Sequence, residues 1–239
     1  TRTVPYTIRT FPVSDPAAVA LGAQPLAAET SRNYGFGLVF TPRRGPQATL
    51  DFYQVDVDER IILSGNLIGP NVQDYLTSVG IPFVSGGRFF TNAVDTRTRG
   101  ADLVGSWPFA VGAGEGSLEF GHNYNQTRVR AIRANPEQLG LAGLVLPVIT
   151  RDEQGHITVG TPRNKSYLGY KWALSAWNAR VRVTRYGPWT NLGSTPAADQ
   201  TYAARTLLDV SLGYTWRNLT ATLGGNNVTN RYPERNNPL

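Results

Sequence analysis

Apolar and polar residues alternate with a period of two in four stretches of this chain of 239 residues. In the first stretch Tyr34 and Phe36 point to one side of an extended backbone, while Gly35 points to the other. This alternation is typical of a β-strand whose two faces meet different surroundings. The pattern predicts four antiparallel hairpins, which span residues 34–63, 98–129, 166–186 and 206–227. We therefore expect an all-β chain of about eight strands.

The connections between these strands alternate between short and long. Turns within the hairpins have about two to five residues, whereas the connections between hairpins span residues 64–97, 130–165 and 187–205. Residues 1–33 have the same Pro-rich, loop-like composition. Loops of this length are unusual in a compact soluble domain, but outer-membrane barrels combine short periplasmic turns with long extracellular loops. The spacing predicts an up-and-down transmembrane β-barrel segment with its long loops, including residues 1–33, outside the cell.

The side chains on these strands fit the wall of such a barrel. A wall needs apolar residues toward lipid, aromatic residues at the two interfaces and polar residues toward the lumen. Aromatic residues occur near predicted strand ends or turns at Trp107, Trp172, Trp177, Trp189, Tyr214 and Trp216. Charged residues that alternate with apolar neighbours are expected to face the lumen, and these are Asp56, Asp58, Glu119, Arg180 and Arg182.

Composition narrows the function further. The chain has no Cys, which excludes disulfides and thiolate chemistry. It has no run of roughly 18 apolar residues, so a helical membrane span is not expected. The formal charge of +6 is scattered along the chain rather than gathered into a basic patch, which argues against nucleic acid as a partner. The absence of Met leads us to expect a piece of a longer protein.

No pattern indicates catalysis, a cofactor or a metal site. Asp56, Asp58 and Glu59 follow one another along a strand and lack the glycine turn of a calcium loop. His122 and His156 have no metal-ligand spacing, and His122 shares the parity of apolar neighbours, so we expect an interfacial histidine. Asp102, Glu119 and Asp209 show no spacing that marks an acid and a base. We expect a protein that is not an enzyme.

Four blocks of sequence resemble one family, the TonB-dependent outer-membrane receptors. Residues 224–235 resemble the family's closing signature, which follows the penultimate barrel strand. Residues 26–38 are similar to a segment that leads into a mid-barrel strand, although Ala28 and Gly35 replace the usual Pro and acid. Residues 51–61 and 89–103 resemble later blocks in the family's order. The resemblance implies that residues 1–239 are the C-terminal part of a 22-stranded barrel that lacks its last strand.

The resemblance also implies a function and partners. It implies a transporter in the outer membrane of a Gram-negative bacterium, surrounded by lipid and completed by the remainder of the barrel from the same or another chain. Uptake of a scarce nutrient would be energised by the TonB–ExbB–ExbD complex through a plug segment that this sequence does not contain. A ferric siderophore is the first candidate ligand, and cobalamin or a carbohydrate is a further candidate. No cofactor is implied.

Two alternatives remain open at this point. A passive porin-like barrel would show the same alternation, and a soluble β-sandwich binding module could use the aromatic residues as core. If a ligand is bound, the long loops are where we expect contact, because pockets combine aromatic surface with a few polar groups. The candidate contact residues are Arg88, Phe89, Phe90, Asn92, Tyr75 and Trp189.

Overall fold

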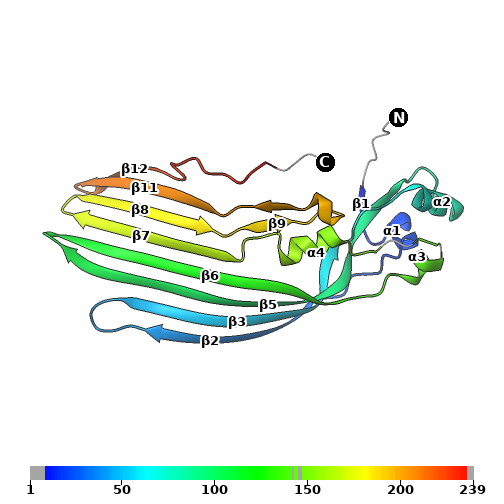
Figure 1. Ribbon diagram of the computed structural model, residues 1–239, viewed down its shortest axis with the longest axis horizontal. Coiled ribbons are helices and arrows are strands. Elements are labelled where there is room, and N and C mark those ends of the chain that lie inside the picture. The colour runs from blue at the N-terminus through cyan, green and yellow to red at the C-terminus, as the bar shows by residue number, and fades with distance from the viewer. Residues whose placement is uncertain (1–8, 142, 145–146, 236–239) are drawn as a thin grey trace.

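The long strands form one open antiparallel sheet in the order in which they occur along the chain. The computed structural model describes residues 9–141, 143–144 and 147–235, so residues 1–8 of the expected first loop and residues 236–239 lie outside the described part. The sheet order is β2-β3-β5-β6-β7-β8-β11-β12, and each long strand hydrogen-bonds to the next (Figure 1). These strands are β2 (Thr30–Phe40), β3 (Gln47–Leu63), β5 (Gly86–Val111), β6 (Gly114–Ile132), β7 (Asn164–Leu174), β8 (Trp177–Tyr186), β11 (Arg205–Trp216) and β12 (Leu219–Gly225).

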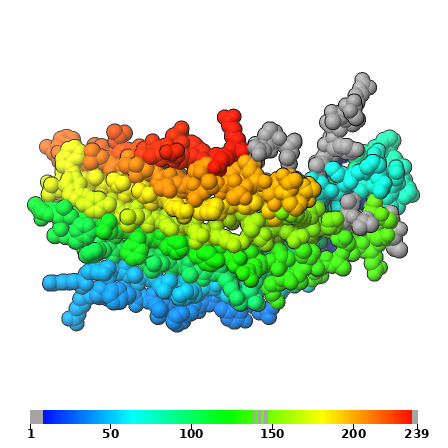
Figure 2. Space-filling model, viewed as in Figure 1, coloured from blue at the N-terminus to red at the C-terminus, as the bar shows by residue number. Residues whose placement is uncertain are grey.

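The sheet is an arc rather than a closed barrel. Figure 2 shows the strands as adjacent bands in chain order, and β2 and β12 form the two edges. Short strands accompany the arc: β1 (Arg9–Phe11) and β4 (Leu67–Ile68) pair with β5, while β9 (Trp189–Asn191) and β10 (Gln200–Tyr202) pair with each other. None of the helices among the described residues is both long and apolar enough to cross a membrane.

The two ends of the sheet differ in their connections. At one end the hairpins close through tight turns, such as the two residues between β5 and β6 (Figure 1). Gly112 has φ 58° in that turn, a left-handed conformation that glycine adopts without steric cost. The opposite end carries the long connections with their helices: α1 (Pro16–Ala20), α2 (Pro70–Ser78), α3 (Glu137–Leu141), α4 (Arg151–Thr158) and the 3-10 helix η1 (Pro196–Ala198).

Several predicted boundaries were wrong. Strand β5 begins at Gly86, so the expected loop of residues 64–97 contains α2 and the first part of this strand. Strand β2 begins within the expected first loop, at Thr30, and β12 ends at Gly225 rather than at residue 227. The first residues of β5 do not alternate clearly between apolar and polar types, so the sequence pattern does not identify them as a strand. Hydrogen bonds to β3, including the pair Leu63 and Phe90, hold them extended.

The register divides the long strands into two chemically distinct faces. The cross-strand row Phe36, Phe52, Ala101 and Tyr124 belongs to one face, and the row Asp51, Asp102 and Asn123 belongs to the other. The first is called the apolar face, and its exposed members include Phe36, Leu38, Phe40, Phe52, Trp107, Leu168, Trp177, Val181, Val183, Leu212, Tyr214, Leu219 and Leu223. The second is called the polar face. Large apolar side chains are therefore displayed outward instead of being packed in a core.

The buried core lies at the loop end of the molecule. Helices α1, α2 and α3 and strands β1 and β4 gather there around the start of β5 (Figure 1). Leu21, Leu76 and Leu139 are fully buried, and Phe89 is 1% exposed. This loop-end core gives the long connections a fixed structure.

We expect Phe89→Ala to loosen the loop-end core by about 3–5 kcal/mol, because it leaves a large cavity among packed side chains. Phe90→Ala is the matched control, since Phe90 is 46% exposed and its loss should cost less than about 1 kcal/mol. Amide hydrogen exchange of α1 and α2 measures the difference. Equal acceleration in both variants would contradict the burial of Phe89.

Candidate functional site

The polar face carries a cluster of charged side chains from three adjacent strands. Glu119 on β6 accepts hydrogen bonds from Lys171 Nζ on β7 and from Arg180 Nη2 on β8, the latter at 3.3 Å. The guanidinium of Arg182 lies over the ring of Tyr167, 4.1 Å from its centroid. These side chains converge because register places Glu119, Gly169 and Arg182 in one row. The cluster presents more positive than negative charge.

Gly121 leaves room for the ring of Tyr167 in this cluster. A Cβ on Gly121 would lie 2.2 Å from the Tyr167 ring, which is closer than a real Cβ approaches. The glycine therefore allows the ring to lie against the sheet and Arg182 to stack on it. A cation held over an aromatic face gains electrostatic attraction from the ring quadrupole.

Further along the polar face, toward the loops, amide and carboxylate groups replace the cations. Asn123 donates to Asp102, and Asn125 Nδ2 donates to Asn123 Oδ1 at 3.0 Å. A hollow of about 560 Å³ lies here, bordered by Asp102, Asn123, Lys165, Tyr167, Arg182 and Asp209 among others. Groups of both signs border this hollow, so it can accept hydrogen bonds and donate them.

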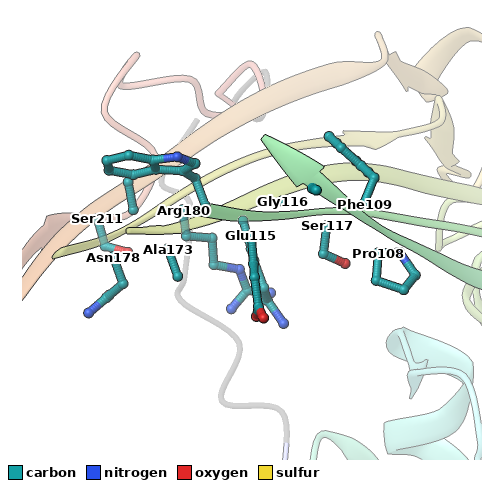
Figure 3. A pocket seen from close by; sticks show the side chains of 13 residues that line it. Pro108, Phe109, Glu115, Gly116, Ser117, Ala173, Asn178, Arg180 and Ser211 are labelled. Atoms are coloured by element: carbon teal, nitrogen blue, oxygen red, sulfur yellow. The ribbon is translucent and has the colours of Figure 1, made fainter. Parts of the chain in front are cut away.

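A second hollow, of about 710 Å³, lies nearer to the tight turns. In Figure 3, the side chains of Ser117, Asn178 and Arg180 extend to one side of the sheet, and Phe109 extends to the other. The close-up thus displays the alternation between polar and apolar faces. Such a surface can line a water-filled passage while its reverse side meets apolar surroundings.

The structure does not bring the five predicted lumenal residues to one face. Glu119, Arg180 and Arg182 share the polar face, but Asp56 and Asp58 lie on the same face as Phe52. The expectation for these two aspartates is therefore corrected. The alternation of Asp56 with Val55 separates two faces but does not reveal which of them Glu119 shares; only the register across β3, β5 and β6 does.

Strand β5 supplies four of the predicted ligand contacts, and their environments differ. Phe89 is buried in the loop-end core, so it does not present a contact surface. Asn92 Nδ2 donates to the carbonyls of Ala27 and Glu59 at 2.9 and 2.7 Å, and its Oδ1 accepts from Ala27 N–H at 2.9 Å. Asn92 thus ties the chain before β2 to β5. Arg88 Nε donates to Thr10 Oγ1 at 3.1 Å, and Phe90 is exposed.

The other two predicted contacts take part in loop packing. Tyr75 on α2 donates its hydroxyl to the carbonyl of Ala20 at 3.1 Å. Trp189 on β9 stacks on Tyr202 of β10, with centroids 3.9 Å apart and planes at 10°. Trp189 is therefore part of the loop end rather than of the aromatic rows near the tight turns.

Sequence reasoning missed several residues of the polar face. Tyr167 and Lys171 have the opposite parity to Leu168 and Tyr170, so the same alternation could have identified them. Asp102 and Asn123 become neighbours only through the register of β5 with β6, which the sequence does not state.

A loop ion pair fixes the hairpin that holds Trp189. Arg151 at the start of α4 binds Asp199 in bidentate fashion, with N–O distances of 2.5 and 2.6 Å. Arg151 also donates to the carbonyl of Gly193 at 2.9 Å, and Asp199 accepts from Gly193 N–H at 3.0 Å. The hydrogen bonds from Arg151 lower the pKa of Asp199 despite the opposing effect of burial.

Comparison with known proteins identifies the class of this sheet. The sequence profile described as "TonB dependent receptor-like, beta-barrel" matches residues 4–228. The chain belongs to this family. Proteins of the family are transporters and receptors of the Gram-negative outer membrane, bind ligands and interact with TonB. No curated protein sequence matches the chain.

Solved structures of several family members resemble the sheet. The copper transporter OprC is 17% identical with a TM-score of 0.57, over 89% of this chain and 27% of its own. The ferric yersiniabactin uptake receptor FyuA from Yersinia pestis is 16% identical with a TM-score of 0.54, over 87% and 26%. The outer membrane transporter YddB from Escherichia coli is 12% identical with a TM-score of 0.60, over 87% and 30%. The matches thus span less than a third of each of these proteins.

The pair of Arg151 and Asp199 should make the β9–β10 hairpin sensitive to acid. Because the pKa of folded Asp199 lies below its ordinary 3.8, the pair stabilises the hairpin above that value and is lost as the pH falls through the lower folded pKa. Hydrogen exchange of residues 189–202, corrected for intrinsic rates, should therefore accelerate in this acidic range. Asp199→Asn should accelerate exchange already at pH 7, whereas Asp152→Asn should not; protection that persists in Asp199→Asn would contradict this role.

Val181 and Arg182 are neighbours on β8 but lie on opposite faces, so we expect them to differ in how well they tolerate a change of charge. Val181→Arg places a cation on the apolar face and should lower the free energy of unfolding from lipid vesicles by about 2–4 kcal/mol. Arg182→Ala removes the stacking on Tyr167 from the polar face and should cost about 0.5–1 kcal/mol. Urea titration of vesicle-inserted intact receptor measures both changes. Equal costs would refute the assignment of the faces.

Proposed function

We propose that this chain forms one arc of the wall of an active outer-membrane transporter that imports a scarce nutrient, with a ferric siderophore as the first candidate. The observation that carries the proposal is the contrast between the two faces of the sheet. Aromatic and aliphatic side chains are exposed on one face. On the other face Lys171 and Arg180 donate hydrogen bonds to Glu119, and Arg182 stacks on Tyr167. Lipid would meet the apolar face, and the polar face would line the lumen.

The orientation follows from the two ends of the sheet. In the proposed arrangement the tight turns lie in the periplasm and the loop end lies outside the cell, where it first meets the ligand. Arg88 and Phe90 are the strongest of the predicted contacts in this arrangement, because their side chains reach the surface. Trp189 contributes through the stacked pair that it forms with Tyr202.

The edges of the sheet support a larger assembly. Strands β2 and β12 each have a hydrogen-bonded neighbour on one side within the sheet, and an unpaired strand edge in lipid is costly. Further strands from the same or another chain would complete the wall. Energy would arrive from the TonB–ExbB–ExbD complex through a plug segment outside this sequence.

The nature of the cargo is proposed from the resembling structures. The copper transporter OprC and the ferric yersiniabactin uptake receptor FyuA resemble the sheet, as does the pyoverdine receptor FpvA from Pseudomonas aeruginosa PAO1. Two of these three proteins are receptors for a siderophore, which favours a ferric siderophore for this chain as well. Cobalamin and carbohydrates remain outcomes of the test.

Whole-cell uptake by the intact receptor tests the proposal. The probes are radio-iron-labelled ferric yersiniabactin and ferric pyoverdine, with labelled cobalamin and a labelled oligosaccharide as further arms. Uptake of one probe should fall at least tenfold when TonB is deleted or a protonophore is added, because TonB transmits the proton-motive force. Binding in the cold should persist, since binding alone needs no energy.

Cells with the empty vector provide the background for this assay. Uptake that continues without TonB or the proton-motive force would overturn active transport and identify a passive pore. The same charged wall could line such a pore, so the energy requirement is the measurement that separates the two functions.

A further inference from the structure

A band of arginine residues lies on the apolar side of the sheet, directly beyond its aromatic rows. Register places Phe36, Phe52 and Tyr124 in one row across strands β2 to β6. The next row on the same face contains Tyr34 and Arg99, and the row after it is Arg32, Asp56, Arg97 and Arg128. Rows on one face are about 7 Å apart along a strand. We call Arg32, Arg97, Arg99, Arg128 and Arg130 the outer arginine band.

The carboxylates within the band do not balance its charge. Arg97 binds Asp56 through Nε and Nη2 at 2.6 and 2.8 Å. Arg32 and Arg130 share Asp58, at 2.8 and 3.1 Å. Two carboxylates therefore serve three guanidinium groups.

The remaining two arginines have neutral hydrogen-bond partners. Arg99 Nε donates to Gln54 Oε1 at 2.7 Å, and Arg128 Nη2 donates to Gln126 Oε1 at 3.2 Å. An amide oxygen orients a guanidinium but does not neutralise it. Arg99 and Arg128 are both exposed, so their charge is directed outward.

The nearest further acids are already engaged farther from the aromatic rows. Glu59 forms an ion pair with Arg133, and Asp95 Oδ1 accepts the Glu59 N–H at 2.9 Å. They lie beyond Asp58 along β3 and beyond Arg97 along β5. The positive excess is thus concentrated next to the apolar surface.

We propose that the outer arginine band binds the phosphate groups of lipids in the outer leaflet, with Arg99 and Arg128 as the principal contacts. This inference rests on the proposed placement of the apolar face against lipid. Guanidinium groups match phosphate oxygens with paired, charge-assisted hydrogen bonds. The aromatic row beneath supplies the surface on which the acyl chains of the same lipid lie. This combination favours a lipid over a free anion, because a free anion would gain nothing from Phe52 or Tyr124.

The test measures lipid retention by the intact receptor in phosphatidylcholine nanodiscs that contain diphosphoryl lipid A. Native mass spectrometry counts the lipid A molecules retained on release from the nanodisc. The double variant Arg99→Gln/Arg128→Gln should reduce the affinity for lipid A at least tenfold, since it removes the two cations with neutral partners. Arg43→Gln/Arg44→Gln is the matched control, because it removes the same charge from a tight turn at the other end of the sheet.

Unchanged retention in the Arg99/Arg128 variant, or an equal loss in the control, would overturn the proposal. Displacement of lipid A by millimolar inorganic phosphate would also overturn it, because it would show a site for the free anion. The assay contains neither nutrient nor TonB. An unaltered receptor that takes up nutrient but retains no lipid A would therefore refute this inference alone, and one that retains lipid A but takes up no nutrient would refute the proposed function alone.

Discussion

The whole structure depends on the register between neighbouring strands. Side chains alternate between the faces of a strand, so a slip of one residue would transfer every side chain of that strand to the other face. In this sheet such a slip of β8 would move Val181 and Val183 to the polar face and Arg182 to the apolar face. It would also separate Arg180 from Glu119 and Arg182 from the ring of Tyr167. The charged cluster around Glu119 is a direct consequence, since its members come from different strands and meet because each register is correct.

The molecule separates two uses of hydrophobic residues. In the loop end, Leu21, Leu76 and Phe89 are buried in a core similar to that of a small globular domain. On the long strands, Phe36, Leu168 and Leu212 are displayed on an outer surface, where they would be unfavourable in water. The buried core holds the long connections in place, and the displayed surface defines where the wall meets its surroundings. Strand β5 belongs to both regions. Its start packs against the helices of the loop-end core, and alternate residues toward its end contribute side chains to the apolar face.

Arginine residues have different roles according to the face of the sheet that they occupy and their position along the strands. Arg182 is stacked on Tyr167 among the polar side chains of the wall. Arg97 lies on the opposite face and is neutralised by Asp56, whereas its neighbour Arg99 contacts an amide. Arg151 holds a loop hairpin through Asp199. The residue type is the same in each case, and the surroundings decide whether it stacks on an aromatic ring, is neutralised by a carboxylate, contacts an amide or stabilises a loop.

The sequence by itself determined the eight long strands in outline and the class of fold, because alternation, turn spacing and the four blocks of family resemblance are local properties of the chain. It also identified Glu119, Arg180 and Arg182 as charged positions set between apolar neighbours. It did not reveal the helices and short strands of the loop end. It could not determine that Phe89 is buried or that Asn92 ties two segments together, since both depend on residues far away along the chain. Tertiary structure alone decided that Asp56 and Asp58 lie on the same face as Phe52. The physical reason is that alternation defines two faces without naming them, and only pairing with strands of known polarity shows which face each residue joins.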